Sequence, residues 1–174
     1  MIPRASLPAL ACLAAASCAA PPVPPSAPIA SLGRSAAFSA PDDRGDLAHV
    51  PQQADRATVL ELWATRCEPC RRAVPALAAR APGLAKEGIH VVLVGVLDGG
   101  EPLEDARAAL ASWGVGLPFL VDRGGGVARS LGVLGFPTTL VLDRRGVVRW
   151  AAPAGARAEA VAEAARRVAV ERGR

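Results

Sequence analysis

Two cysteines with two residues between them, Cys67 and Cys70, are the feature that most constrains the fold of this chain. They follow an apolar, strand-like run, residues 58–63, and stand where a helix-like run begins. At such a junction, unpaired N–H groups and the positive end of the helix dipole favour a thiolate over a thiol. The second cysteine lies one helical turn later, close enough to form a disulfide with the first. The pattern therefore predicts a strand–turn–helix unit suited to thiol–disulfide exchange.

A zinc site is the alternative interpretation of this pair, because many zinc sites use the same cysteine spacing. The sequence holds no second pair of this kind, and its two histidines, His49 and His90, lie well away with no paired spacing. A purely structural disulfide would stabilise little here, since closing so small a ring removes little chain entropy. We therefore favour redox chemistry, and we expect neither a metal nor a bound cofactor.

Two proline motifs accompany the cysteines. Pro75 stands inside the predicted helix, where it removes a backbone hydrogen bond, and residues 135–139 read Gly-Phe-Pro-Thr-Thr before a predicted strand. Together with Trp-Ala-Thr-Arg-Cys-Glu-Pro-Cys at residues 63–70, these motifs resemble the thioredoxin superfamily, specifically the extracytoplasmic TlpA/ResA-like thiol-disulfide oxidoreductases. The resemblance runs from about Phe38 to the C-terminus. It implies an α/β thioredoxin fold: a central mixed sheet flanked by helices, with an N-terminal extension and a helix–strand insert at about residues 103–121.

Each polar group around the cysteines has an expected role. Placement at the helix start and nearby arginines predict that Cys67 is the attacking nucleophile, although Glu68 opposes them. Cys70, placed deeper, would resolve the mixed disulfide. Glu61 is the candidate base for Cys70, because thioredoxins carry a buried aspartate at that position and Glu61 shares a strand face with Trp63. Desolvation would raise its pKa toward neutrality, and the alternative is that it faces solvent.

The resemblance also implies a substrate surface. Pro137 would be cis and pack against the disulfide, which leaves the backbone of Phe136 free to pair with a substrate strand. Trp63 and Arg66 complete the expected surface, and Arg66 replaces the tryptophan that many relatives carry before the first cysteine. Ala73 stands where several cytochrome-maturation members have a functional glutamate, which weakens a cytochrome-specific assignment.

The N-terminal residues resemble an export signal, with a weakly positive start, a short apolar run and small residues after it. Cys18 ends Ala-Ala-Ser-Cys, which resembles a bacterial lipobox, so we expect lipidation there, with an ordinary signal-peptidase cut as the alternative. The expected domains are a signal at residues 1–20, a proline-rich tether at 21–35 and one thioredoxin-like domain at 36–174.

The formal net charge of +4 comes from scattered arginines, and three Phe, three Trp and no Tyr offer little for bases to stack on, which disfavours nucleic-acid binding. The expected function is an extracytoplasmic, membrane-anchored enzyme that reduces disulfides of exported proteins, in cytochrome or copper-site assembly. A membrane thiol–disulfide relay would supply its electrons. The alternatives are a disulfide oxidant or isomerase, a Cu(I)-binding chaperone and a thiol peroxidase. The last is disfavoured because Thr65 lies two residues before Cys67, where peroxidases use three.

Overall fold

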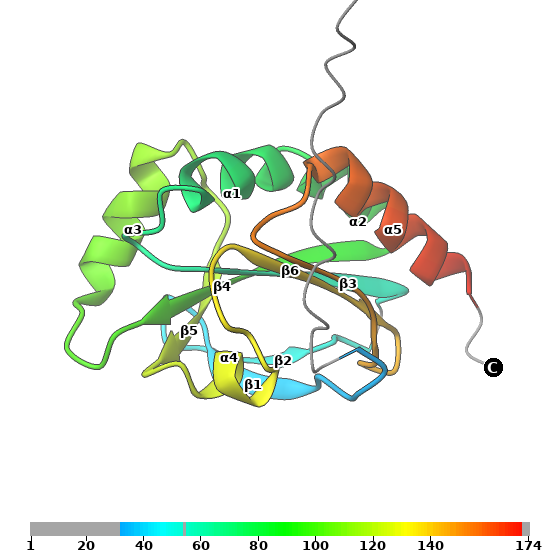
Figure 1. The fold of residues 1–174 in the computed structure, drawn as a ribbon, viewed down its shortest axis with the longest axis horizontal. Coiled ribbons are helices and arrows are strands. Elements are labelled where there is room, and N and C mark those ends of the chain that lie inside the picture. The colour runs from blue at the N-terminus through cyan, green and yellow to red at the C-terminus, as the bar shows by residue number, and fades with distance from the viewer. Residues whose placement is uncertain (1–31, 54, 172–174) are drawn as a thin grey trace, which may run out of the picture.

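The computed structural model describes residues 32–53 and 55–171. The expected signal at residues 1–20, with Cys18, and residues 21–31 of the expected tether lie outside this part of the chain. Five strands form one sheet in the order β5-β4-β3-β6-β7, and β1 and β2 form a separate hairpin (Figure 1). Within the described residues, no helix is long and apolar enough to cross a membrane.

Strands and helices alternate through most of the chain. The strands are β1 (Phe38–Pro41), β2 (Leu47–Val50), β3 (Ala57–Trp63), β4 (Ile89–Leu97), β5 (Phe119–Arg123), β6 (Thr138–Asp143) and β7 (Val148–Pro153). The helices are α1 (Cys70–Ala78), α2 (Ala81–Lys86), α3 (Leu103–Ser112), α4 (Gly126–Ser130) and α5 (Ala158–Val170). In the sheet, β3, β4 and β5 are parallel, whereas β6 and β7 are antiparallel to their neighbours.

The sheet is covered on both faces. Helices α1, α2, α3 and α5 lie on one face, and the β1–β2 hairpin and α4 lie on the other (Figure 1). Every residue of β3 is buried, as expected for a central strand with two covered faces. Leu60 and Leu62 pack into the core on the hairpin side, whereas Val59 and Trp63 pack into the cores under the helices. By this alternation Glu61 points to the helix side.

The expected fold class is confirmed, including the insert, in which α3 leads from β4 to the edge strand β5. The helical segment after the cysteines is divided in two: α1 ends at Ala78, and α2 begins at Ala81. Pro82 therefore lies in the first turn of α2, where its missing N–H leaves no helical hydrogen bond unmade.

The N-terminal segment contacts both edges of the sheet. At β7, the N–H of Gly33 donates to the carbonyl of Val148 at 2.9 Å, and the N–H of Val148 donates to Arg34 at 3.0 Å. At β5, the N–H of Asp43 donates to the carbonyl of Phe119 at 2.9 Å. Residues 33–35, expected to belong to the tether, are thus hydrogen-bonded to the folded domain.

Candidate redox site

Cys67 and Cys70 are joined by a disulfide, and their Cα atoms are 5.2 Å apart. Cys70 is the first residue of α1 and is fully buried, whereas Cys67 lies in the preceding turn and is partly exposed. The N–H of Cys70 points at Sγ of Cys67, 3.2 Å away. After reduction this N–H would stabilise a thiolate on Cys67. Exposure and hydrogen bonding both favour Cys67 as the sulfur that meets a partner.

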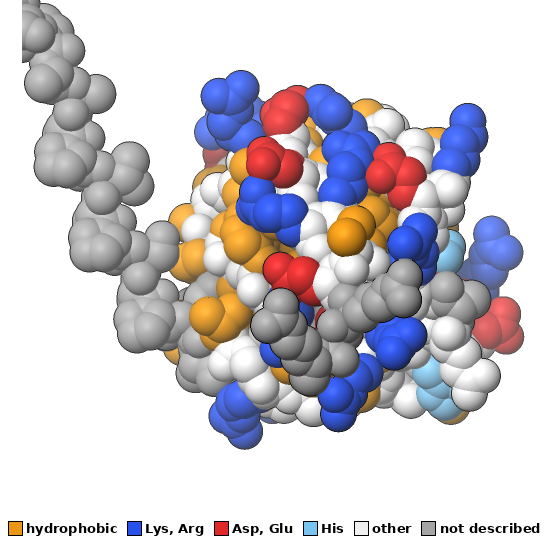
Figure 2. Space-filling model, turned by 90° about the vertical axis from the view of Figure 1, so that its right-hand side faces the viewer, with side chains coloured by type: hydrophobic (Ala, Val, Ile, Leu, Met, Phe, Trp, Pro, Cys, Tyr) orange, Lys and Arg blue, Asp and Glu red, His pale blue; other side chains and the backbone are white. Residues whose placement is uncertain are grey.

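The charges around the cysteines are more balanced than the sequence suggested. Arg71 pairs with Glu68 at 3.5 Å, and both side chains are largely exposed. Arg66 and Arg72 are exposed as well, with no ion pair to any described residue. Figure 2 draws a different face of the molecule, the right-hand side of Figure 1, and there too basic side chains are interspersed with acidic ones. The backbone N–H of Cys70 is therefore the more direct support for a Cys67 thiolate.

Glu61 is buried in the middle of the sheet, with 1% of its surface exposed. It lies between Leu93 of β4 and Thr139 of β6 in the strand register. Its Oε2 accepts a hydrogen bond of 2.6 Å from Oγ1 of Thr139. Burial raises the pKa of Glu61 to about 7, against the opposing effect of the Thr139 hydrogen bond. The alternative that Glu61 faces solvent is wrong, and its role as a base remains a prediction.

Trp63 does not form part of the surface. It is fully buried, and its ring packs edge-to-face on Trp113 and Phe119, with centroids 5.4 Å and 5.5 Å away. Its Nε1 has no hydrogen-bond partner within the described residues. The expectation that Trp63 contacts a substrate is therefore wrong for this structure, because α3 and β5 enclose the end of β3. Instead, the ring shares an apolar cluster with Cys70.

The loop before β6 lies beside α1. The peptide bond between Phe136 and Pro137 is cis, as the resemblance implied, and so is the bond before Pro51, which was not expected. Gly155, at φ +81°, faces Pro137: a Cβ there would lie 3.0 Å from Cγ of Pro137 and 3.8 Å from Cβ of Ala73. The loop after β7 thus packs against Pro137, and the close contact and the positive φ both favour glycine at residue 155.

Arg66 and Phe136, two of the expected substrate-contacting residues, line a cavity of about 330 Å³. Three acidic residues also line this cavity: Asp98, Glu101 and Asp105. The hydroxyl of Thr65 hydrogen-bonds Glu101 across this cavity. These acids were not predictable from the sequence, because nothing in their spacing indicates that the segment after β4 folds back toward Arg66.

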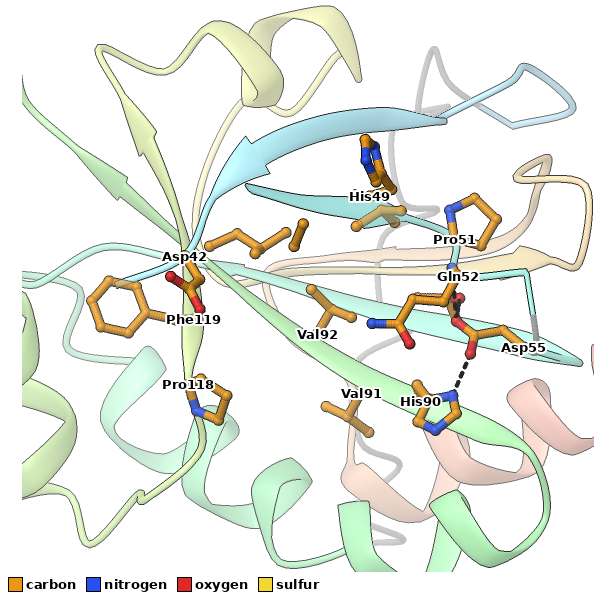
Figure 3. A pocket seen from close by; sticks show the side chains of 14 residues that line it. Asp42, His49, Pro51, Gln52, Asp55, His90, Val91, Val92, Pro118 and Phe119 are labelled. Carbon is orange, nitrogen blue, oxygen red and sulfur yellow. Dashed lines mark hydrogen bonds and ion pairs between the residues drawn. The ribbon is translucent and has the colours of Figure 1, made fainter. Parts of the chain in front are cut away.

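A second cavity, of about 260 Å³, lies between the β1–β2 hairpin and the sheet (Figure 3). At one end, Nδ1 of His90 hydrogen-bonds the buried carboxylate of Asp55. His49 also lines this cavity and is hydrogen-bonded to Ser39 at 2.6 Å. Neither cysteine lines the cavity, so the two histidines belong to a different part of the molecule from the cysteine pair.

The sequence pattern of the AhpC/TSA family matches residues 32–151. The chain belongs to the AhpC/TSA family. One relative, the thiol-disulfide oxidoreductase ResA of Geobacillus thermodenitrificans, is 31% identical over 94 residues, which cover 54% of this chain and 52% of the relative. The thioredoxin-like protein YneN of Bacillus subtilis is 28% identical over 112 residues, covering 64% and 65%. The chain thus spans between about half and two thirds of the length of these curated relatives.

Solved structures match over most of their length. A thiol:disulfide interchange protein DsbE from Chlorobium tepidum superposes with a TM-score of 0.70 at 25% identity, covering 79% of this chain and 97% of that one. StoA from Bacillus subtilis, at 17% identity, shows the fold alone, with a TM-score of 0.65 and coverage of 76% and 98%. The resemblance to ResA-like thiol-disulfide oxidoreductases that the motifs indicated is confirmed.

Proposed function

We propose that this protein is an enzyme that exchanges thiols and disulfides with partner proteins through Cys67 and Cys70. The observation that carries the proposal is the pairing of a partly exposed Cys67 with a fully buried Cys70 in one disulfide at the start of α1. One sulfur is accessible to a partner, and the other can be reached only from within the site. The names of the relatives support the same chemistry.

The reaction has two steps. In the reduced enzyme, the Cys67 thiolate attacks one sulfur of a partner disulfide, forms a mixed disulfide and releases the partner's other sulfur as a thiolate. The Cys70 thiolate then attacks Sγ of Cys67, which closes the enzyme disulfide and releases the remaining partner sulfur. Two electrons pass from the enzyme dithiol to the partner, and the reverse sequence oxidises a partner dithiol.

The second step requires Cys70 to lose its proton inside an apolar core. Burial raises the cost of a thiolate there, so a nearby proton acceptor would accelerate the step. Glu61 is our candidate, because burial brings its pKa to about 7 and its strand face carries the core that contains Cys70. A carboxyl with this pKa can accept a proton near neutral pH and release it afterwards.

We also propose that the enzyme acts outside the cytoplasm as a reductant of exported proteins. The expected signal at residues 1–20 supports this location, and lipidation of Cys18 would anchor the protein at a membrane. A membrane thiol–disulfide relay would then supply two electrons per cycle, since extracytoplasmic compartments are oxidising. Cytochromes and copper-site proteins are the partner classes that the resemblance favours. The mass of the processed N-terminus tests the anchor, and the reduction potential of the cysteine pair tests the direction.

The hydrogen bond of Thr65 is relevant to the alternative that the protein is a thiol peroxidase. Its hydroxyl hydrogen-bonds Glu101, so the hydroxyl proton is not available to Cys67. This supports exchange with partner proteins over peroxide reduction. Copper content after anaerobic purification distinguishes the chaperone alternative, because soft thiolates bind Cu(I).

Single cysteine substitutions test the proposed enzyme. Cys67→Ser should abolish reduction of insulin or a model disulfide, whereas Cys70→Ser should accumulate a mixed disulfide through Cys67, visible by mass spectrometry under non-reducing conditions. Substituting exposed Ser112, at the end of α3, by alanine serves as the control and should leave the rate unchanged. If Cys67→Ser trapped partners instead, the two roles would be reversed. Exchange activity that survives loss of both cysteines would disprove the proposal.

A further inference from the structure

We propose that Thr139 is a positioning residue that holds the Glu61 carboxyl through its hydroxyl and thereby sets the pH range in which Cys70 is deprotonated. The inference rests on the proposed function, because it concerns a residue that acts through the candidate base. In this role Thr139 acts only on the carboxyl that would take the proton.

The strand register places the two side chains together. Glu61 of β3 and Thr139 of β6 are direct partners in the antiparallel pair, so their side chains leave the sheet on the same face. Both residues are 1% exposed. The distance of 2.6 Å between Oγ1 and Oε2 is that of a hydroxyl donating to a carboxylate. Because both strands are central in the sheet, neither partner can move away without disturbing the sheet.

The other described side chains on this face of the sheet offer the Glu61 carboxyl neither a hydrogen bond nor a nearby charge. The buried side chains of α1 and α5 that pack on it are apolar apart from Cys70, and β4 contributes Leu93. The charged groups of the surrounding elements lie on the outer surface or at the far end of the face: Arg71 and Arg72 on α1, Lys86 on α2, Glu159, Glu163, Arg166 and Arg167 on α5, and Asp143 with Arg149 on β6 and β7. Within the described residues, Thr139 supplies the one side-chain hydrogen bond to Glu61.

A single hydrogen-bond donor to a buried carboxyl lowers the pKa of that carboxyl. Burial disfavours the carboxylate, and the Thr139 hydroxyl favours it, so the pKa of Glu61 settles between these two influences. Without the hydroxyl, the carboxyl would remain protonated to higher pH, and a smaller fraction of it could accept the Cys70 proton at neutrality. The same bond fixes Oε2, which leaves Oε1 as the oxygen available for proton transfer.

The test measures the pH dependence of the resolving step in Thr139→Val. Reduced protein is mixed with one equivalent of an aromatic disulfide, and release of the second aromatic thiolate is followed by stopped flow from about pH 6 to pH 9. The midpoint should move up by about one pH unit, the size expected for losing a hydrogen bond to a charged group. At pH 7 this corresponds to a rate about fivefold lower. Carbon NMR of the labelled Glu61 carboxyl should show the same shift independently.

Two further variants separate positioning from structural damage. Thr139→Ser keeps the hydroxyl and should restore the wild-type midpoint. Thr58→Val is the matched control, because the hydroxyl of buried Thr58, on the opposite face of β3, donates to the carboxylate of Asp55 at 2.8 Å. It should lower stability and leave the midpoint where it was.

The outcomes distinguish this inference from the function on which it rests. The positioning role is overturned if Thr139→Val has the same midpoint as the wild type while Glu61→Gln has lost the midpoint. The proposed function would still stand in that case. A midpoint that shifts equally in Thr58→Val also overturns it, since the effect would then be a general loss of packing. An absence of release of the second thiolate in the wild type contradicts the proposed function itself.

Discussion

Glu61 and Asp143 lie on the same face of the β3–β6 pair, toward opposite ends, and their pKa values are shifted in opposite directions. Near the cysteines, Glu61 has one hydroxyl donor, and burial raises its pKa to about 7. At the other end, Asp143 is also buried, at 5% exposure. Burial would raise its pKa too, but the backbone N–H groups of Val147 and Arg145 and the Arg149 side chain together hold it below the ordinary value.

The comparison shows that burial alone does not decide the charge of a carboxyl. Asp143 receives backbone hydrogen bonds of 2.8 Å and 3.0 Å at Oδ1 and one of 2.8 Å from Arg149 at Oδ2. Donors of this number and charge offset the loss of hydration. Asp143 is therefore suited to stabilise the β6–β7 turn as an anion at neutral pH, whereas Glu61 can change its protonation there.

The largest expected effect is that of Glu61→Gln on exchange. Glutamine can hydrogen-bond Thr139 but cannot accept a proton, so the resolving step should slow by about a hundredfold or more at neutral pH. Stopped-flow release of the second thiolate measures this rate. A variant as fast as the wild type across the neutral range would show that Glu61 takes no part in proton transfer.

The same variant should change the pH dependence of folding. Because the folded pKa of Glu61 lies at about 7 and its ordinary value is 4.5, the wild type should lose stability as the pH rises from about 4.5 to about 7. The loss corresponds to about 3 kcal/mol and should persist above that range. Denaturant unfolding of the disulfide form, in which the cysteines do not titrate, should show this decline in the wild type and not in Glu61→Gln.

Asp143→Ala should lower stability and leave the exchange rate unchanged. It removes three hydrogen bonds from a turn and should lower the free energy of unfolding at neutral pH by about 2 kcal/mol, without slowing exchange. Because the pKa of Asp143 is lowered from 3.8, its stabilisation exists above that pH and is lost as the pH falls below it. The difference between variant and wild type should therefore shrink in acid. A tenfold loss of exchange activity would show instead that the two ends of the sheet are coupled.

The smallest expected effect comes from Arg149→Met. The guanidinium side chain is 37% exposed, and a partly exposed ion pair contributes about 1 kcal/mol or less. The two backbone donors remain, so Asp143 should still titrate below its ordinary pKa in this variant, as carboxyl NMR can verify. A full return to the ordinary value would mean that Arg149, and not the turn backbone, controls this carboxyl.

Much of this arrangement is predictable from the sequence, because apolar periodicity reports which face of an element is buried. The alternation around Trp63 placed Glu61 on the correct face, and the expected strand at residues 58–63 matches β3 to within one residue. The partner of Glu61 was not predictable. Thr139 follows 78 residues later, and its position opposite Glu61 depends on the register of two strands, which the sequence does not specify.

Trp63 and Asp143 illustrate two other limits. A tryptophan near a cysteine motif is compatible with either a surface or a core, and only the docking of α3 and β5, through Trp113 and Phe119, determines that it is buried. Asp143 precedes a turn rich in arginine and glycine, where an aspartate is usually solvated. Its burial depends on backbone N–H groups that converge on it only once the hairpin has formed.

The contacts of the N-terminal segment with β5 and β7 have a consequence for aggregation. Exposed edge strands can pair with other chains, and proteins commonly prevent this by covering them. Here one continuous segment covers part of both edges, through Gly33 and Arg34 at β7 and through Asp43 at β5. A chain shortened to begin at residue 36 would still cover the β5 edge and would leave the β7 edge uncovered. Protection against self-association thus resides in residues that the redox chemistry does not use.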